Sequence, residues 1–309
     1  MKGVFSVLIV LQGALEQGFL YALVALALFL SYSILDIADL TTDGAFTLGC
    51  AVSATVCLAG HPVLALPMAV AAGAAAGFVT AFLQTKLGVP SILAGIITNF
   101  GLYSINMMVM GGANRPIGLK NQTVFTLAQG AGVLGGWAKL AVAAVIVLAA
   151  GGALVFFLGT RLGLSIRATG DNKDMVRASS INPVFTITVG LCVANALTAL
   201  SGGLVAQYMK SSDINQGTGM VVIGLASLII GQTLIGRGGM ARCVAAVLLG
   251  SVIYQLFYVA ALRFNVPGEY LKLIAAVIVA GAIAMPALKQ WAGLQKRRHA
   301  ARRHRGGER

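Results

Sequence analysis

The acidic residues of this chain stand where acids are rare. Glu16 lies inside the first long apolar run, and Asp36, Asp39 and Asp43 lie between that run and the next. An acid at the centre of a membrane costs about 2.5–3.5 kcal/mol on insertion scales, so such an acid is a candidate for binding a solute or an ion. If the first run instead begins near Gly18, Glu16 lies at the outer membrane interface. Both interpretations of Glu16 stand.

The segment Leu35–Gly44 combines its three aspartates with two threonines and a glycine. Polar, non-helical backbone is tolerated at membrane depth only where it is buried in protein or lines a cavity. Broken helices of this kind build solute sites in transporters. Alternatively, the segment is a turn at the cytoplasmic surface in which Asp39 and Asp43 cap the next helix. The residues alone do not choose between a pathway and a cap.

A polar stripe runs along the fourth apolar run, because Asn99, Tyr103 and Asn106 are spaced i, i+4 and i+7. Residues at this spacing share one face of a helix. Such a face should contact protein or a water-filled path, although hydrogen bonding between helices explains it equally well. Asn195 begins a weaker stripe in the sixth run. The candidate residues for a path are Glu16, Asp39, Asp43, Asn99, Tyr103 and Asn106.

Residues for enzymatic chemistry are missing from the sequence. It contains no GxxxxGK[ST] motif, and Gly231–Gly239 lacks the Lys-Ser/Thr pair that would hold nucleotide phosphates. It contains no HExxH motif and no Ser-His-Asp arrangement. The four cysteines form no CxxC pair and have no companion histidines, so we interpret them as apolar packing residues and expect no metal site. Any ATP hydrolysis must belong to another chain.

Composition places these residues in a membrane. Of the 309 residues, 58% are hydrophobic and 10% are charged, against about 25% charged residues in soluble domains. We therefore expect an all-α polytopic membrane protein with about 8–9 transmembrane helices, one of them broken or re-entrant near residues 35–60. The apolar runs cover approximately residues 6–34, 44–60, 63–85, 91–111, 138–160, 184–209, 219–236, 243–264 and 269–288.

Charge predicts the domain organisation and the orientation. Residues 1–288 form one membrane domain, and residues 289–309 form a basic tail. Positive residues collect on the cytoplasmic side, which places the tail, Arg237–Arg242 and Gly163–Asn182 there. The loops 112–137, 210–218 and 265–268 then lie outside. The +13 net charge is explained by this tail and by its attraction to anionic lipid headgroups, without a role in nucleic-acid binding.

Small residues predict close helix packing. Gly73 and Gly77 form a GxxxG pattern, which lets two helix backbones approach each other. We expect this pattern to serve packing within one chain in preference to a seam between two copies.

The stretch Gly163–Asn182 reads GLSIRATGDNKDMVRASSIN and is too polar to lie in hydrocarbon. Gly170-Asp171-Asn172 supplies helix-cap chemistry, and Pro183 begins the next element. We expect a short, water-exposed helix that contributes little to packing inside the membrane. Such a helix suits the docking of a soluble partner, and an ordinary solvated loop is the alternative.

The same stretch resembles the coupling-loop motif of ABC importer permeases. The similarity rests on Arg167-Ala-Thr-Gly-Asp-Asn172, followed by Ala178 and Ile181-Asn182. It is closest to the superfamily of the ribose and branched-chain amino acid permeases. Tyr21–Val52 and Val252–Ala275 resemble the tryptophan/tyrosine-type permeases of that superfamily. The resemblance covers approximately residues 14–288.

This resemblance implies the transmembrane permease subunit of a bacterial ABC importer, in the cytoplasmic (inner) membrane. It implies a permease homodimer, a separate ABC ATPase that binds ATP and Mg²⁺, and an extracytoplasmic substrate-binding protein. No cofactor is expected on this chain, and the solute would be an amino acid or a similar small compound. The residues implied in coupling to the ATPase are Arg167, Gly170, Asp171, Asn172, Met175 and Arg177.

The residues themselves also fit a different class of transporter. An ion-coupled secondary transporter would use Glu16 and the aspartate cluster as carriers and would need no ATPase. Inverted repeats are typical of such transporters, and no convincing pairing is visible between the two halves of this sequence. The charged segment Gly163–Asn182 has no clear purpose in that case.

Overall fold

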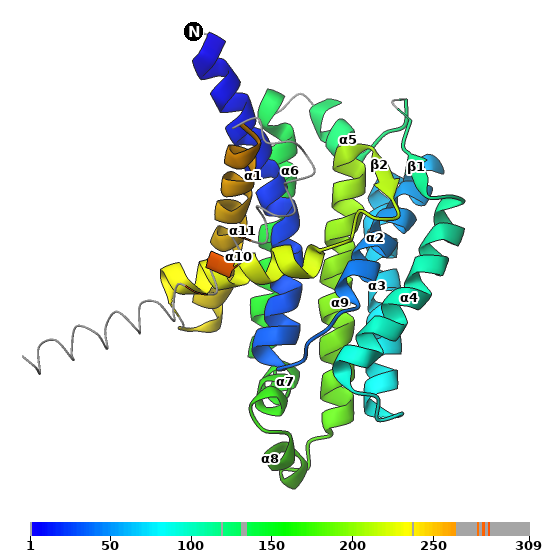
Figure 1. Cartoon of the computed structure of the whole chain (residues 1–309), viewed down its shortest axis with the longest axis vertical. Coiled ribbons are helices and arrows are strands. Elements are labelled where there is room, and N and C mark those ends of the chain that lie inside the picture. Colours follow the sequence, from blue (N-terminus) through cyan, green and yellow to red (C-terminus); the bar gives the residue numbers. More distant parts are fainter. Residues whose placement is uncertain are drawn as a thin grey trace, which may run out of the picture.

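The computed structural model describes residues 2–118, 120–130, 135–236 and 238–263, with the isolated positions 277, 280, 281 and 284. Helices form nearly all of it (Figure 1). The long helices are α1 (Lys2–Leu28), α2 (Thr42–Leu58), α3 (Pro62–Thr85), α4 (Ser91–Met110), α6 (Ala138–Gly159), α9 (Pro183–Met209), α10 (Met220–Ile235) and α11 (Met240–Arg263). The short elements are the π-helix η1 (Phe29–Ile34), β1 (Asn114–Pro116), α5 (Val124–Gly130), the 3-10 helix η2 (Gly135–Trp137), α7 (Arg161–Asp171), α8 (Lys173–Ala178) and β2 (Ser211–Asp213).

The all-α membrane fold expected from composition is confirmed. Within the described ranges, six helices are long and apolar enough to cross a membrane, and α2 and α10 are shorter apolar helices. The break expected near residues 35–60 is also present, because the first helix ends with η1 at Ile34 and α2 begins only at Thr42. The apolar run 219–236 differs from a simple span, since α10 lies across the bundle (Figure 1). The run 269–288 and the basic tail fall largely outside the described residues.

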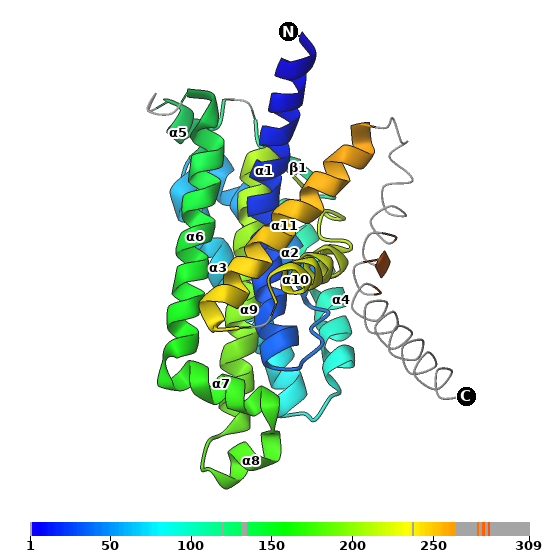
Figure 2. The ribbon, with the colours of Figure 1, turned by 90° about the vertical axis from the view of Figure 1, so that its left-hand side faces the viewer.

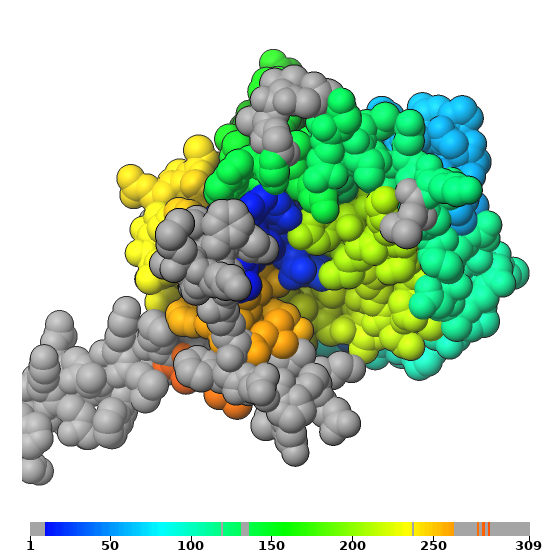
Figure 3. All heavy atoms as spheres, turned by 90° about the horizontal axis from the view of Figure 1, so that it is seen from above, coloured from blue at the N-terminus to red at the C-terminus, as the bar shows by residue number. Residues whose placement is uncertain are grey.

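The two ends of the bundle carry different elements. The helices α7 and α8 lie at one end, and α5, β1 and β2 lie at the other (Figures 1 and 2). The strands β1 and β2 pair antiparallel, with Asn114 opposite Asp213. Seen from that end, the yellow-green atoms around the end of α9 lie between the blue α1 and the cyan-green segment after α4 (Figure 3). The described parts of loops 112–137 and 210–218, both expected outside, therefore gather at one end, opposite Gly163–Asn182, while loop 265–268 lies outside the described residues.

Glycines bring α9 into backbone contact with its neighbours. A Cβ atom added to Gly73 or Gly77 of α3 would lie 2.3 Å from the Asn195 carbonyl oxygen or 2.4 Å from the Leu191 carbonyl oxygen. Real Cβ atoms do not approach so closely, so this crossing requires glycine. The expectation that the GxxxG pattern packs helices within one chain is confirmed.

Candidate functional site

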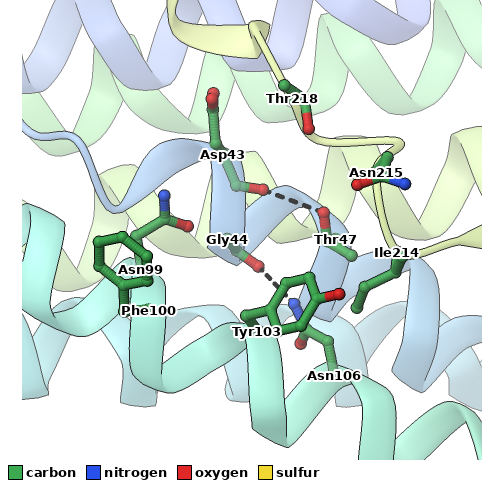
Figure 4. Close-up of a pocket in the computed structure, with 10 residues that line it drawn as sticks. All are labelled: Asp43, Gly44, Thr47, Asn99, Phe100, Tyr103, Asn106, Ile214, Asn215 and Thr218. Carbon is green, nitrogen blue, oxygen red and sulfur yellow. Dashed lines mark hydrogen bonds between the residues drawn. The ribbon is translucent and has the colours of Figure 1, made fainter. Parts of the chain in front are cut away.

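A cavity of about 460 Å³ opens where three discontinuous elements meet (Figure 4). The start of α2, one face of α4 and the irregular segment between β2 and α10 supply its walls. Its lining residues are Asp43, Gly44, Thr47, Asn99, Phe100, Tyr103, Asn106, Ile214, Asn215 and Thr218. The structure thus brings the polar stripe of the fourth apolar run together with Asp43.

The stripe on α4 bonds to its neighbouring helix and also lines the cavity. Asn106 is 1% exposed, and its Nδ2 donates to the Gly44 carbonyl oxygen at 3.1 Å. Among the described residues its Oδ1 has no hydrogen-bond partner. Tyr103 is 49% exposed, so its ring stands at the open side of the cavity. One residue of the stripe therefore bonds helix to helix, while another faces open space.

Asp43 caps a helix, although not the one that follows it in sequence. Its Oδ2 accepts from the Gly219 amide at 2.9 Å and its Oδ1 from the Val221 amide at 3.0 Å. These amides belong to the start of α10, where unpaired N–H groups and the helix dipole favour a negative charge. The carboxylate therefore fastens α2 to α10. In Figure 4 it points away from the α4 stripe.

Asp39 is 4% exposed and is not among the residues that line the cavity. Its Oδ1 accepts from the Thr41 amide at 2.9 Å, and its Oδ2 accepts from Asn195 Nδ2 at 2.7 Å. The second bond ties the break between η1 and α2 to the middle of α9. The first stripe residue of the sixth run is thereby paired with one of the predicted acids.

Glu16 is not among the residues that line the cavity, and it is not bonded to the Asp39–Asn195 pair. It sits within the apolar span Val10–Ile34 and is 5% exposed. Its carboxylate accepts from Gln12 Nε2 at 2.9 Å and from the Tyr208 hydroxyl at 2.8 Å. The Lys139 ammonium lies 5.5 Å from the centroid of the Tyr208 ring. Glu16 is therefore a buried group that joins α1 to the end of α9.

The polar stretch Gly163–Asn182 forms two helices where one was expected. Asn172 caps α8, because its Oδ1 accepts from the amides of Asp174 and Met175, each at 3.0 Å. Met175 is 58% exposed. Arg177 forms a 3.6 Å ion pair with Asp174 on the surface of α8. The helix α8 projects from the end of the bundle (Figures 1 and 2).

The expectation that this whole stretch contributes little to packing is wrong for α7. Ile166 and Thr169 are fully buried, and Thr169 Oγ1 lies 2.8 Å from Thr186 Oγ1 of α9. Arg167 and Gly170 are half-buried on the same helix, while Asp171 is exposed at its end. The six residues predicted for coupling thus divide between a packed helix and a projecting one.

Sequence reasoning missed a second cavity, of about 410 Å³, between α1, α10 and α11. Tyr21, Tyr254 and Tyr258 line it, and Gln255 Nε2 donates to Gln17 Oε1 at 2.5 Å. Gln17 with Tyr21, and Tyr254 with Tyr258, are each spaced i, i+4, which puts each pair on one helix face. That spacing was a usable signal. Thr218 lines both cavities, so the segment before α10 separates them.

Comparisons with known proteins match nearly the whole chain. The family model described as "Branched-chain amino acid transport system / permease component" matches residues 10–285. The tyrosine transport system permease protein of Clostridioides difficile (strain R20291) is 34% identical over 285 residues, which cover 92% of this chain and 91% of the relative. The ribose import permease protein of Escherichia coli (strain K12) is 27% identical over 256 residues, covering 82% and 78%.

A solved structure shares the fold. It is described as an inward-facing conformation of a metal-chelate type ABC transporter, and it matches with a TM-score of 0.52 at 15% identity. The match covers 91% of this chain and 85% of that one.

Proposed function

Because the chain belongs to the branched-chain amino acid transport system / permease component family, we propose that it is the permease through which an ATP-driven bacterial importer moves a small amino acid-like solute. As an ABC transporter permease, it is a multi-pass protein of the inner membrane. The observation that carries the proposal is α8: a capped, exposed helix that projects from one end of the bundle. Its exposed Met175 supplies apolar surface for a soluble ATPase.

The solute passes the cavity between α2, α4 and the segment before α10. Its lining offers amide, hydroxyl and aromatic groups, which suit a small polar compound with an apolar part. Similarity to a tyrosine transport permease supports an amino acid as that compound. We assign Asn99 and Tyr103 to the wall of the path. Asp43 and Asn106 hold that wall in place through their bonds to α10 and α2.

Two copies of the chain enclose the path. Phe100 lines the cavity and is 75% exposed, and Tyr103 beside it is half-exposed. One chain therefore leaves this wall open, and a second copy facing α4 closes it. This supports a permease homodimer. The binding protein docks at the end that carries α5, β1 and β2, and the ATPase, with its ATP and Mg²⁺, docks at the end that carries α7 and α8.

Ion-coupled transport has weaker support. Carriers of protons or sodium need a carboxylate that exchanges its partner during the cycle. Asp39, Asp43 and Glu16 each accept a hydrogen bond from a residue of another helix or of its cap. Their placement is that of groups that join helices.

The proposal is tested by affinity purification of the full chain from its native membranes. We expect an ATPase subunit to co-purify at about one copy per permease, and the isolated complex to hydrolyse ATP. The variant Gln122→Glu, an exposed change at the opposite end, serves as a control that keeps the ATPase. Purification without any ATPase, together with solute uptake by the chain alone, would contradict the proposal.

A further inference from the structure

The non-helical segment Leu35–Thr41, which we call the break, joins η1 to α2 and packs directly on α7. A Cβ atom added to Gly170 would lie 1.8 Å from the Ile34 carbonyl oxygen and 3.0 Å from Leu35 Cα. Side-chain atoms do not fit at that distance, so the two backbones touch. A movement of α7 toward the break is therefore applied to its start.

The break is also held by α9 and α3, while Asp36 faces an open cavity on another side. Gly190 of α9 lies so close that its added Cβ would be 2.4 Å from Leu35 Cδ1. Asp39 is bonded to Asn195 of α9, and Thr41 Oγ1 lies 2.8 Å from Thr80 Oγ1 of α3. Leu35 is 0% and Ile37 2% exposed. A segment packed in this way passes on a displacement instead of absorbing it, because close-packed interiors have low compressibility.

The C-terminal end of the break, Thr41, directly precedes α2, whose first turns line the cavity. Asp43 binds the start of α10 two residues beyond Thr41. A Cβ atom on Gly44 would lie 2.5 Å from Asn99 Oδ1, so α2 and α4 touch at this point. Moving the break thus moves two walls of the cavity together.

We propose that Leu35–Thr41 carries the displacement of α7 to the cavity, and that Gly170, Asp39 and Asn195 are the positioning residues of this transmission. The proposal rests on the proposed function, since it needs an ATPase that moves α8 and α7. It assigns Gly170 a contact inside the membrane domain in addition to any role in docking. It also gives the buried pair of Asp39 and Asn195 a role that needs no contact with the solute.

The test measures the accessibility of the cavity, while the substitutions are made outside the cavity. A cysteine is placed at Tyr103, in a chain whose native Cys50, Cys57, Cys192 and Cys243 have been replaced. The complete transporter in membranes is treated with a membrane-impermeant thiol reagent, with and without nucleotide trapped on the ATPase. In the parent chain we expect the labelling rate to change about 10-fold on trapping, an ordinary size for coupling between two sites.

Gly170→Ala separates transmission from docking. It leaves α8 and its Asn172 cap unaltered, so we expect the ATPase to co-purify as before. The methyl group pushes α7 off the break, so the change in labelling on nucleotide trapping should fall below about 2-fold, less than coupled sites ordinarily show. Gly159→Ala is the matched control, because nothing lies within 4 Å of a Cβ added there. It should keep the full change.

The pair of Asp39 and Asn195 provides an independent variant. Asp39→Asn leaves α7 unaltered. Its side chain has one oxygen, so it can accept from the Thr41 backbone N–H or from Asn195 Nδ2 but not from both. We expect this loss also to abolish the change in labelling. The double variant D39N/N195D restores one donor and one acceptor across the pair. It also loses the bond from Asn195 Nδ2 to the Leu191 carbonyl oxygen, which measures 3.1 Å, so we expect it to recover part of the response. The Asp39 and Asn195 variants therefore test the proposal even if the Gly170→Ala chain does not assemble with the ATPase.

The outcomes separate the inference from the proposed function. A full labelling response in Gly170→Ala and in Asp39→Asn, with the ATPase bound, would overturn the transmission through Leu35–Thr41 and leave the importer assignment intact. If the labelling rate at position 103 in the parent chain is the same with and without trapped nucleotide, both the inference and the assignment of the path are overturned. Loss of the response in both variants with recovery in the double variant supports the inference.

Discussion

Met175→Glu should abolish uptake without disturbing the fold. Met175 is 58% exposed on α8, a helix that buries only Val176. The substitution therefore costs the permease little packing. In the complex it places an unpaired carboxylate in an apolar contact with the ATPase. The resulting penalty of about 3 kcal/mol corresponds to roughly a 100-fold loss of affinity between the two subunits.

Co-purification of the ATPase and solute uptake measure this loss. The permease variant itself should be extracted and melt like the parent. Gln122→Glu introduces the same residue at an exposed position of the opposite end, so it should retain the ATPase. If Met175→Glu keeps both the ATPase and normal uptake, α8 is not the docking helix.

Gly202→Val should prevent the chain from folding stably. A Cβ atom at Gly202 would lie 2.0 Å from the Phe46 carbonyl oxygen, and one at Gly49 would lie 2.0 Å from the Ala199 carbonyl oxygen. The helices α2 and α9 thus touch backbone to backbone. Valine forces them apart and breaks the bond from Ser53 Oγ to the Gly203 carbonyl oxygen, which measures 3.0 Å. We expect a loss of at least about 3 kcal/mol, at the upper end for overpacked cores.

The apparent melting temperature in detergent and the yield of extracted protein report this effect. Gly101→Val is the matched control on α4, since nothing lies within 4 Å of a Cβ there. It should extract and melt like the parent chain. Equal melting temperatures for the two valine variants would mean that the crossing of α2 and α9 tolerates a side chain.

Local patterns in the sequence predicted much of this arrangement. Composition and run lengths indicated the membrane helices, and the i, i+4, i+7 spacing of Asn99, Tyr103 and Asn106 placed them on one face. The cap at Asn172 and the helix start at Pro183 follow rules that act over a few residues. These features depend on neighbours in the chain, so a single sequence contains the information.

Contacts between distant residues could not be predicted in this way. Asp43 was expected to cap the helix that follows it or to line a path; it lines the cavity, and its carboxylate caps α10, which lies far away in the sequence. The partner of Asp39 is Asn195, which is 156 residues away. The close contact of Gly170 with Ile34 likewise cannot be predicted from a stretch whose composition is polar. Each depends on which helices meet, and apolar runs of similar composition do not specify their partners.

Uptake by the purified complex in sealed vesicles tests the central claim most directly. The permease, its co-purified ATPase and the binding protein are reconstituted, and labelled tyrosine and other amino acids are offered on the side of the binding protein. We expect accumulation that requires ATP on the opposite side, persists with proton and sodium ionophores and disappears in Met175→Glu. Uptake driven by an ion gradient by the permease alone, without ATP or the ATPase, would contradict the account.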